Sequence, residues 1–405
     1  MSRTILDIHI LQTVPPSNLN RDDTGAPKSA FYGGVRRARV SSQAWKRATR
    51  TAFSSLLDPS ELGVRTKKVA ELLAGRITAL APELPASAAV EVAAETFRTA
   101  TGSKIEVPKR KSKENGEEQS AAPESSYLMF LSTRQLDSLA ELAVKACNGT
   151  GDLSALKSFF KDKNNKALAR ELVNTRHSVD IALFGRMVAD SADLNVEAAT
   201  QVAHALSVHA VDTESDYYTA VDDGAMKKEE KEEEKGAGMI GVVDFNSATL
   251  YRYAALDVDR LHRNLGPGLR KDESATQPTR RAVKAFLEGF VASLPTGKVN
   301  SFGHNTLPSV VLVKLRTSRP ISFVAAFERP VSREEDGGFL RNSCARLAEY
   351  IPQLEQAYGC GNDRTWVMRY GADTEPLAEL GRALPLPELV RAVGDAAVAR
   401  LESAA

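Results

Sequence analysis

The sequence predicts an α+β protein in which helical material is inserted into a sheet domain. Apolar residues alternate with a period of two near the N-terminus and again beyond residue 249, a pattern that indicates strands. Between them, residues 59–199 are rich in Ala and Leu, which favour helices. Residues 213–247 carry a block of mixed charge bounded by glycines, and this composition predicts a protruding insertion rather than a core element.

The first fifty residues predict a strand, a loop and a helix. Residues 4–13 alternate with Ile and Leu, after which Pro15-Pro16 forces a turn. A loop then runs over 20–34. Residues 35–40 can be extended, and Ser41 or Ser42 is a suitable N-cap for a helix that continues to about residue 56.

The later elements follow from the same patterns. Residues 104–126 join a basic KRKSK to ENGEEQS, the composition of a flexible excursion. Helices are predicted at 65–81, 86–100, 126–147, 153–173, 195–210, 280–293, 338–357 and 386–402. Strands are predicted at 249–256, 308–315 and 321–327.

Composition excludes several classes of protein. With 42% hydrophobic residues over 405 positions, the chain can bury a substantial core and is not globally disordered. Its three cysteines have no short-spaced pair, so neither a disulfide framework nor a zinc site is expected. The N-terminus lacks a secretory signal pattern and no apolar run has transmembrane length, so we expect a soluble, cytoplasmic protein.

Charge is distributed unevenly along the chain. The formal net charge is +1, yet the first fifty residues hold nine basic and three acidic residues. Residues 28–50 carry seven basic residues and no acidic one. At helical spacing, Gln43, Lys46, Arg47 and Arg50 share one arc opposite Trp45. A solvated surface of an ordinary enzyme is the alternative, but the scarcity of nearby acids favours binding of a polyanion.

Other residues add to this hypothesis. Arg37 and Arg39 are expected to project from one face of their strand, and Gly33-Gly34 would permit close approach of a ligand. Tyr217 and Tyr218 could stack on bases, although adjacent tyrosines more often pack against protein. A lysine-rich stretch could face a second nucleic-acid strand or be a hydrated helix face; it comprises Lys157, Lys161, Lys163, Lys166 and Arg170.

Catalytic patterns are few. The pairs Asp22-Asp23 and Asp222-Asp223 could hold a divalent ion, but both lie in loop contexts where Asp favours turns. The six histidines form no metal-binding pair, and no phosphate-binding loop, nucleophile elbow or RNP1 consensus occurs.

Four ordered stretches resemble one family. The string LNRDDTGAPKSAFYGGVRRARVSSQAWKRATR at 19–50 is similar to the N-terminal signature of the CasC-type backbone subunit of the type I-E CRISPR Cascade complex, a member of the Cas-seven family. VDIALFGRM at 179–187, AHALSVHAVD leading to DYYTAVDD at 203–223, and the tyrosine-rich strand at 250–255 fit in the same order. Beyond residue 260 the similarity is one of general pattern.

The resemblance implies a subunit shaped like a right hand. A modified RRM-like (ferredoxin-like) palm would comprise 1–57, 200–212 and 248–405, with helical fingers at 58–199 and a thumb insertion at 213–247. Copies would polymerise along a CRISPR RNA, hold it independently of its sequence, kink it at intervals and present it for pairing with target DNA in antiviral defence. The partners implied are CRISPR RNA, target DNA, further copies of the chain, the other Cascade subunits and a recruited nuclease-helicase.

The resemblance also implies site residues. The family's guide-RNA contacts fall on Asn20, Arg21, Lys28, Ser41, Gln43, Lys46 and Arg50, its bulky residue near the fingers on Met187, and its thumb aromatic on Tyr218. From charge and stacking we add Arg36, Arg37, Arg39, Arg47 and Tyr217 as RNA contacts. Target-DNA contacts are assigned to Lys157, Lys161, Lys163 and Lys166.

No catalytic residue, metal or cofactor is expected. Two alternatives stay open: a metal-dependent nuclease subunit that uses Asp22, Asp23, Asp222 and Asp223, and the guide-processing endoribonuclease of the same system. The KKEEKEEEK insertion and the KRKSK loop are departures from the family pattern, which assigns them no role.

Overall fold

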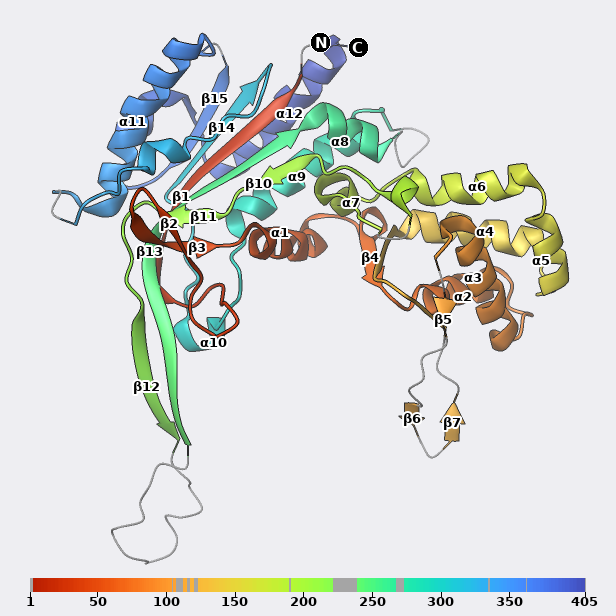
Figure 1. The fold of residues 1–405 in the computed structure, drawn as a ribbon. Coiled ribbons are helices and arrows are strands. Elements are labelled where there is room, and N and C mark those ends of the chain that lie inside the picture. Colours follow the sequence, from red (N-terminus) through yellow and green to blue (C-terminus); the bar gives the residue numbers. More distant parts are fainter. Residues whose placement is uncertain are drawn as a thin grey trace, which may run out of the picture. The chain divides into compact units, whose positions relative to one another are not determined.

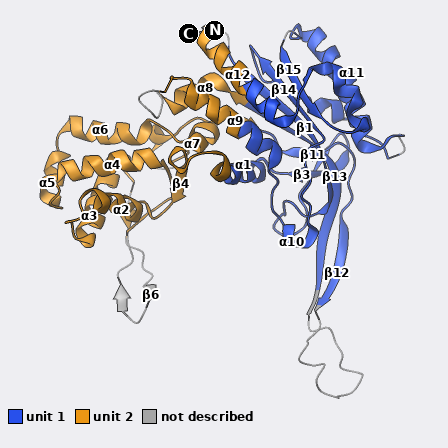
Figure 2. Ribbon diagram, turned by 180° about the vertical axis from the view of Figure 1, so that it is seen from behind, with its two compact units in different colours: residues 1–52, 202–255, 286–393 blue, residues 53–201, 256–285, 394–405 orange. Residues whose placement is uncertain are grey.

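The computed structural model divides the chain into two compact units (Figure 2), each of which is described by itself. It describes residues 3–103, 105–106, 112–114, 117–119, 123–188, 191–220, 239–266, 273–333, 336–361 and 363–404. Unit 1 comprises 1–52, 202–255 and 286–393, and unit 2 comprises 53–201, 256–285 and 394–405. Three helices are divided between the units: α1 (Ser42–Leu56), α9 (Gln277–Ala292) and α12 (Leu386–Ala404).

A mixed ten-stranded sheet forms the centre of unit 1 (Figure 1). Its order is β16-β15-β14-β1-β13-β11-β3-β2, with β10 and β12 also paired to β13. The strands are β1 (Ile5–Ser17), β2 (Ser29–Tyr32), β3 (Val35–Val40), β10 (Thr200–Val202), β11 (Ala205–Ser207), β12 (Glu214–Ala220), β13 (Met239–Asp257), β14 (Val310–Arg316), β15 (Arg364–Arg369) and β16 (Arg382–Ala383). β1 and β14 pair antiparallel and are buried over almost their whole length, because both faces of the sheet are covered.

The two faces of this sheet pack against different elements. On one face, apolar residues of β1, β13 and β14 form a core with η4 (Val324–Phe327), α11 (Gly338–Tyr358) and η5 (Ala372–Leu380). Because side chains alternate along a strand, the neighbouring residues point to the opposite face. There Arg252 of β13 contacts Trp45 of α1 and Phe290 of α9. The short helix α10 (Val299–Phe302) completes unit 1.

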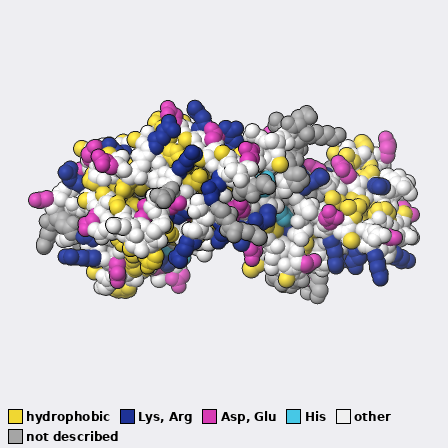
Figure 3. All heavy atoms as spheres, turned by 90° about the horizontal axis from the view of Figure 1, so that it is seen from above, with side chains coloured by type: hydrophobic (Ala, Val, Ile, Leu, Met, Phe, Trp, Pro, Cys, Tyr) yellow, Lys and Arg dark blue, Asp and Glu magenta, His cyan; other side chains and the backbone are white. Residues whose placement is uncertain are grey.

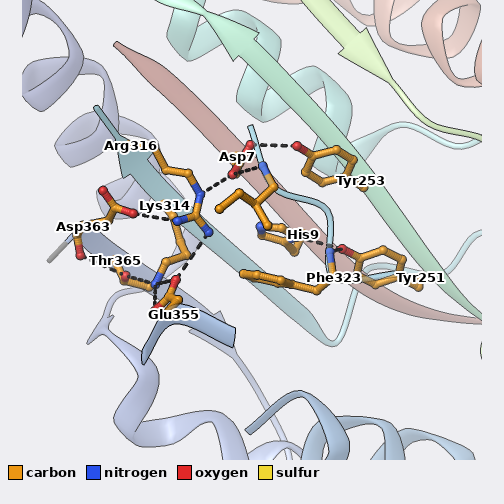
Figure 4. Close-up of polar contacts among 11 residues, drawn as sticks. Asp7, His9, Tyr251, Tyr253, Lys314, Arg316, Phe323, Glu355, Asp363 and Thr365 are labelled. Carbon is orange, nitrogen blue, oxygen red and sulfur yellow. Dashed lines mark hydrogen bonds and ion pairs between the residues drawn. The ribbon is translucent and has the colours of Figure 1, made fainter. Parts of the chain in front are cut away.

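A buried ionic network lies on the α11 face (Figure 4). The Arg316 guanidinium donates to Asp7 at 2.5 Å, to Asp363 at 2.6 Å and to Glu355 at 3.4 Å. Tyr253 donates to Asp7 at 2.8 Å. Further members are Lys314, which donates to Glu355 and Thr365, and His9, which contacts the Tyr251 hydroxyl at 2.8 Å and stacks on Phe323. The network joins β1, β14 and α11, and Asp363 and Thr365 at the start of β15.

Unit 2 is mainly helical. A single apolar core joins the helices from α2 to α6. The elements are η1 (Pro59–Glu61), β4 (Gly63–Thr66), α2 (Val69–Leu80), α3 (Ala86–Thr101), β5 (Ile105–Glu106), β6 (Ser112–Glu114), β7 (Glu117–Gln119), β8 (Glu124–Ser125), β9 (Met129–Ser132), α4 (Thr133–Ala146), α5 (Leu153–Phe159), α6 (Lys163–Asn174), α7 (Val179–Phe184), η2 (Ala192–Leu194) and α8 (Val258–Leu265).

The predicted α+β class is confirmed, with corrections to some elements. Residues 195–210, predicted as a helix, include strands β10 and β11, because β11 pairs with β3 and β13 and tertiary pairing overrides local propensity. In the segment predicted as a strand at 321–327, residues 321–323 have no regular structure and the rest form the 3₁₀ helix η4. The helix predicted from residue 126 begins at Thr133, where Ser132 and Gln135 form a capping box. No helix among the described residues is long and apolar enough to cross a membrane. The division into palm, fingers and thumb stays a prediction.

Candidate nucleic-acid interface

The loop between β1 and β2 is held by its own side chains. Asn18 donates to the Gly25 carbonyl at 2.9 Å and to the Asp244 carbonyl at 2.8 Å. The Asp22 carboxylate accepts hydrogen bonds from the Thr24 hydroxyl and from the backbone N–H groups of Thr24 and Ala26, and these bonds lower its pKa. Asp22 therefore shapes the turn, as its loop context predicts.

Asn20 and Ser41 tie this loop to the start of α1. The Asn20 side-chain carbonyl accepts from the Ser41 N–H at 2.9 Å, and the Ser41 hydroxyl accepts from the Ala44 N–H at 3.3 Å. Ser41 is buried and is the N-cap of α1. The first turn of the helix carries no acidic residue, so its positive end is not neutralised from within.

Helix α1 has a buried side and a basic side. Trp45 and Thr49, one turn apart, are buried. Gln43 and Arg47 are exposed, whereas Lys46 and Arg50 are half-buried. Partial burial lowers the pKa of the Lys46 ammonium. The four predicted residues therefore lie on the less buried side of α1, and neighbouring atoms partly cover two of them, Lys46 and Arg50.

The β2–β3 hairpin places two further basic residues at the surface. Arg36 is exposed, and its guanidinium carbon lies 5.8 Å from the ring centre of the exposed Phe31. Arg39 is half-buried and donates to the Ser29 carbonyl at 3.1 Å. Lys28 is half-buried and Arg21 exposed. These residues and the basic side of α1 all belong to unit 1.

Arg37 departs from the prediction that it shares an outward face with Arg39. It is fully buried and donates to the backbone carbonyls of Tyr32, Ser207, Phe327 and Glu328 at 2.8–3.1 Å. Its guanidinium thus fixes the hairpin to η4, and we leave it out of the proposed RNA contacts.

Gly33 serves the same junction. Its φ is +59°, and a Cβ there would lie 1.6 Å from the Glu328 carbonyl oxygen. At Gly33 the predicted close approach is therefore to the protein's own backbone, whereas a Cβ at Gly34 would meet nothing within 4 Å.

His204 joins the surface, although no motif singled it out. It is exposed beside β11, and its Nδ1 lies 3.4 Å from Arg39 Nη1. Burial, followed by the positive charges of Arg39 and Lys28, lowers its pKa. The signal that could have found it is its position beside a short strand that pairs with the basic strand β3.

The two tyrosines lie on opposite faces of the ribbon formed by β12 and β13, which projects from the sheet of unit 1 (Figure 1). Tyr217 pairs with Val242, and both are 61% exposed. Tyr218 pairs with Gly241, and its ring occupies the space where a Cβ of that glycine would lie. One face therefore presents the ring of Tyr217 and the other presents the ring of Tyr218. Asp222 and Asp223 lie outside the described residues.

In unit 2, Met187 is 85% exposed beside a buried arginine. Arg186 donates to the backbone carbonyls of Leu194, Val173 and Phe130, and burial lowers its pKa to about 10. These bonds anchor the backbone from which Met187 projects.

Part of the lysine-rich stretch lines a hollow of about 280 Å³ within unit 2. Lys157, Lys161 and Lys166 line it together with Arg98 and Arg170; Lys163 does not. Glu95, paired with Arg98, is the acidic residue in the lining. Figure 3 shows Lys and Arg side chains gathered along one margin of the helical part of this unit, at the right of the view.

Among the described residues, no cluster of three or more His, Cys, Asp or Glu side chains is placed to hold a metal ion. The arrangement offers basic and aromatic groups, which suit binding of a polyanion with bases that can stack.

Comparisons with known proteins give a family and two similar solved structures. The model of a family described as CT1975-like protein matches residues 6–392. A chain in a solved structure described as "CRISPR RNA-guided surveillance complex, pre-nicking" is 33% identical, with a TM-score of 0.78, and the match covers 97% of this chain and 100% of that one. A second, from a "CRISPR RNA-guided surveillance complex", is 29% identical with a TM-score of 0.67, covering 97% and 99%. Among curated proteins, none matches.

Proposed function

Because the chain belongs to the CT1975-like family, we propose that it is the CRISPR RNA-binding backbone subunit of a Cascade-type surveillance complex. The observation that carries the proposal is the basic surface of unit 1, where the loop before β2, the β2–β3 hairpin and α1 present basic side chains. Its members are Arg21, Lys28, Arg36, Arg39, Lys46, Arg47 and Arg50. The type I-E assignment rests on the four sequence stretches that resemble the CasC-type subunit.

The chemistry of this surface suits a guide of any sequence. Lysine, arginine and helix N-terminal groups bind phosphates, and such contacts position a nucleic acid without reading its bases. Specificity is then left to pairing between guide and target, as in other RNA-guided complexes. Several copies would lie along one guide.

We further propose that unit 1 holds an RRM-like palm and that the β12–β13 ribbon is the thumb. Tyr218 and Met187 would displace bases at intervals, and Tyr217 would add a stacking surface. In unit 2, the hollow lined by Lys157, Lys161 and Lys166 would bind target-DNA phosphates. Lys163, which lies outside the hollow, is given a weaker role.

The proposal includes no catalytic role. In the nuclease alternative Asp22 would be a metal ligand, yet its carboxylate already accepts three hydrogen bonds from its own loop. The endoribonuclease alternative would need a catalytic histidine at the RNA. His204 lies at the basic surface, so cleavage of an unprocessed guide by the purified chain would favour that alternative.

Charge reversal tests the proposed surface. Lys46→Glu with Arg50→Glu should abolish recovery of CRISPR RNA when the chain is co-expressed with its complex and a CRISPR array, because two contacts become repulsive. The matched control is Arg341→Glu with Arg391→Glu, two exposed arginines on α11 and α12 of the same unit. RNA recovery that is equal in both double variants would refute the assignment of this surface.

A further inference from the structure

Arg252, in the C-terminal third of β13, is a buried cation without an acidic partner among the described residues. Its side chain is 1% exposed. Its Nη1 donates to Gln12 Oε1 at 2.6 Å, and its Nη2 donates to the Phe290 carbonyl. Both acceptors are neutral, and Nε has no hydrogen-bond partner in the described part of the chain.

Two aromatic rings complete its surroundings. The guanidinium carbon lies 3.8 Å from the ring centre of Trp45 and 4.7 Å from that of Phe290, and the two rings meet edge to face at 6.5 Å. Cation–π contacts are stronger for a desolvated arginine than for one at the surface. An aliphatic side chain could fill the same space without the desolvation penalty, so stability alone does not account for an arginine here.

The arginine connects the sheet to the helix that carries the basic surface. Gln12 of β1, which receives the Nη1 bond, itself donates to the Thr306 carbonyl at 2.8 Å. Trp45 belongs to α1, between Gln43 and Lys46. All of these residues lie in unit 1. Because the guanidinium is planar and its donors have fixed directions, it sets the orientation of the ring that packs on it.

Trp45 makes few other directional contacts. Its indole N–H is buried and has no hydrogen-bond partner within the described residues. The indole is therefore placed by packing and by the face of Arg252. The position of the Trp45 side chain sets the rotation of α1 about its axis. Because the basic residues project from the opposite side of the helix, this rotation also sets their direction.

We propose that Arg252 is a positioning residue for guide-RNA binding. Through Trp45 it fixes the rotation of α1, so that Gln43, Lys46 and Arg50 face the RNA backbone together with the loop around Asn20. The inference rests on the proposed function and adds a residue that does not itself touch RNA.

The test compares variants on the two faces of β13. Arg252→Met and Arg252→Lys remove the planar contact, and Lys retains the charge. Tyr253→Phe is the matched control: it is the next residue on the strand, faces the other way, and loses one buried hydrogen bond to Asp7. Binding of the full chain to a labelled RNA of one repeat-spacer unit is measured between 50 and 300 mM salt, an experimental range chosen because phosphate contacts show in the salt slope.

We expect Arg252→Met to bind about tenfold more weakly and to lose about one phosphate contact from the salt slope, since that slope counts neutralised phosphates. Arg252→Lys should restore only part of the affinity, because a charge without the planar face does not seat Trp45. Tyr253→Phe should keep the native slope. Native affinity and slope in Arg252→Met, measured where it is folded, would overturn the inference.

Trp45→Leu keeps the experiment decisive if Arg252→Met does not fold. It leaves the arginine in place and removes the ring, so it should show the same loss of slope; a native slope in Trp45→Leu would also overturn the inference.

The proposed function is tested separately in the same assay. If the native chain does not bind, that function fails; if it binds and only Lys46→Glu with Arg50→Glu weakens binding, Arg252 has no positioning role.

Discussion

Two arginines of unit 1 are equally buried, yet among the described residues only one of them is paired with acidic side chains. Arg316 and Arg252 are each 1% exposed, and they lie on opposite faces of one sheet. Burial alone would lower the pKa of Arg316, but Asp7, Asp363 and Glu355 outweigh it and raise that pKa. Arg252 has no acidic partner within the part of the chain that the structure describes, and burial lowers its pKa to about 9.

The difference indicates that one arginine stabilises the sheet and the other orients a helix. The Arg316 network joins β1, β14, α11 and Asp363 by charge, so each member depends on the others. Arg252 instead meets two ring faces and two neutral oxygens, and one of the rings belongs to the helix with the basic surface. We infer that the first arginine holds the sheet together and that the second orients a helix upon it.

The largest expected effect is on the stability of the Arg316 face. Arg316→Met would leave three carboxylates in a buried site with only Lys314 to offset them, and should lower the free energy of unfolding by about 3–5 kcal/mol. Arg252→Met leaves no carboxylate unpaired among the described residues and should lower the free energy of unfolding by less. Urea unfolding of both variants measures the contrast, and an equal loss in the two would remove the distinction between the faces.

Much of the fold was predictable because its signals are local. The alternation of β1, the N-cap at Ser41 and the long helices α11 and α12 depend on neighbouring residues. The predicted helix at 195–210 was wrong because β11 is extended only by pairing with β3 and β13, which are distant in sequence.

The candidate site shows the same limit. Charge and helical spacing predicted the basic side of α1, because both are read from one segment. They could not distinguish Arg37, which is buried by carbonyls from 207 and 327–328, from the half-exposed Arg39 two residues later. Nor could they find Arg252, whose surroundings come from β1, α1 and α9, or His204, which is distant in sequence from its neighbours Arg39 and Lys28.

A smaller effect is expected from pH on the same network. Burial, followed by the charges of Arg316 and Lys314, lowers the pKa of His9 well below its ordinary value of 6.5. The unfolded chain therefore takes up a proton below pH 6.5 that the folded chain refuses, and stability falls as pH falls. Between pH 7.5 and 5.5 this histidine should account for about 1.4 kcal/mol of the loss.

His9→Gln isolates this contribution. The amide can still contact the Tyr251 hydroxyl but does not titrate. The free energy of unfolding of this variant should fall less steeply with decreasing pH than that of the native chain. An identical slope in both proteins would show that the buried histidine does not govern acid sensitivity on this face.

The smallest expected effect is on RNA binding and lies at His204, which has the positive charges of Arg39 and Lys28 beside it. Its pKa is lowered in the free chain by burial and by Arg39 and Lys28. Bound phosphates would raise that pKa, so binding takes up a proton and tightens as pH falls. Between pH 7.5 and 5.5 we expect a two- to fivefold gain in affinity, of about the size that one titrating histidine supplies.

His204→Gln should flatten the profile of affinity against pH while keeping the native affinity at pH 7.5. A profile that stays steep in this variant would place the titrating group elsewhere, and a flat native profile would mean that no phosphate approaches the pair formed by Arg39 and His204.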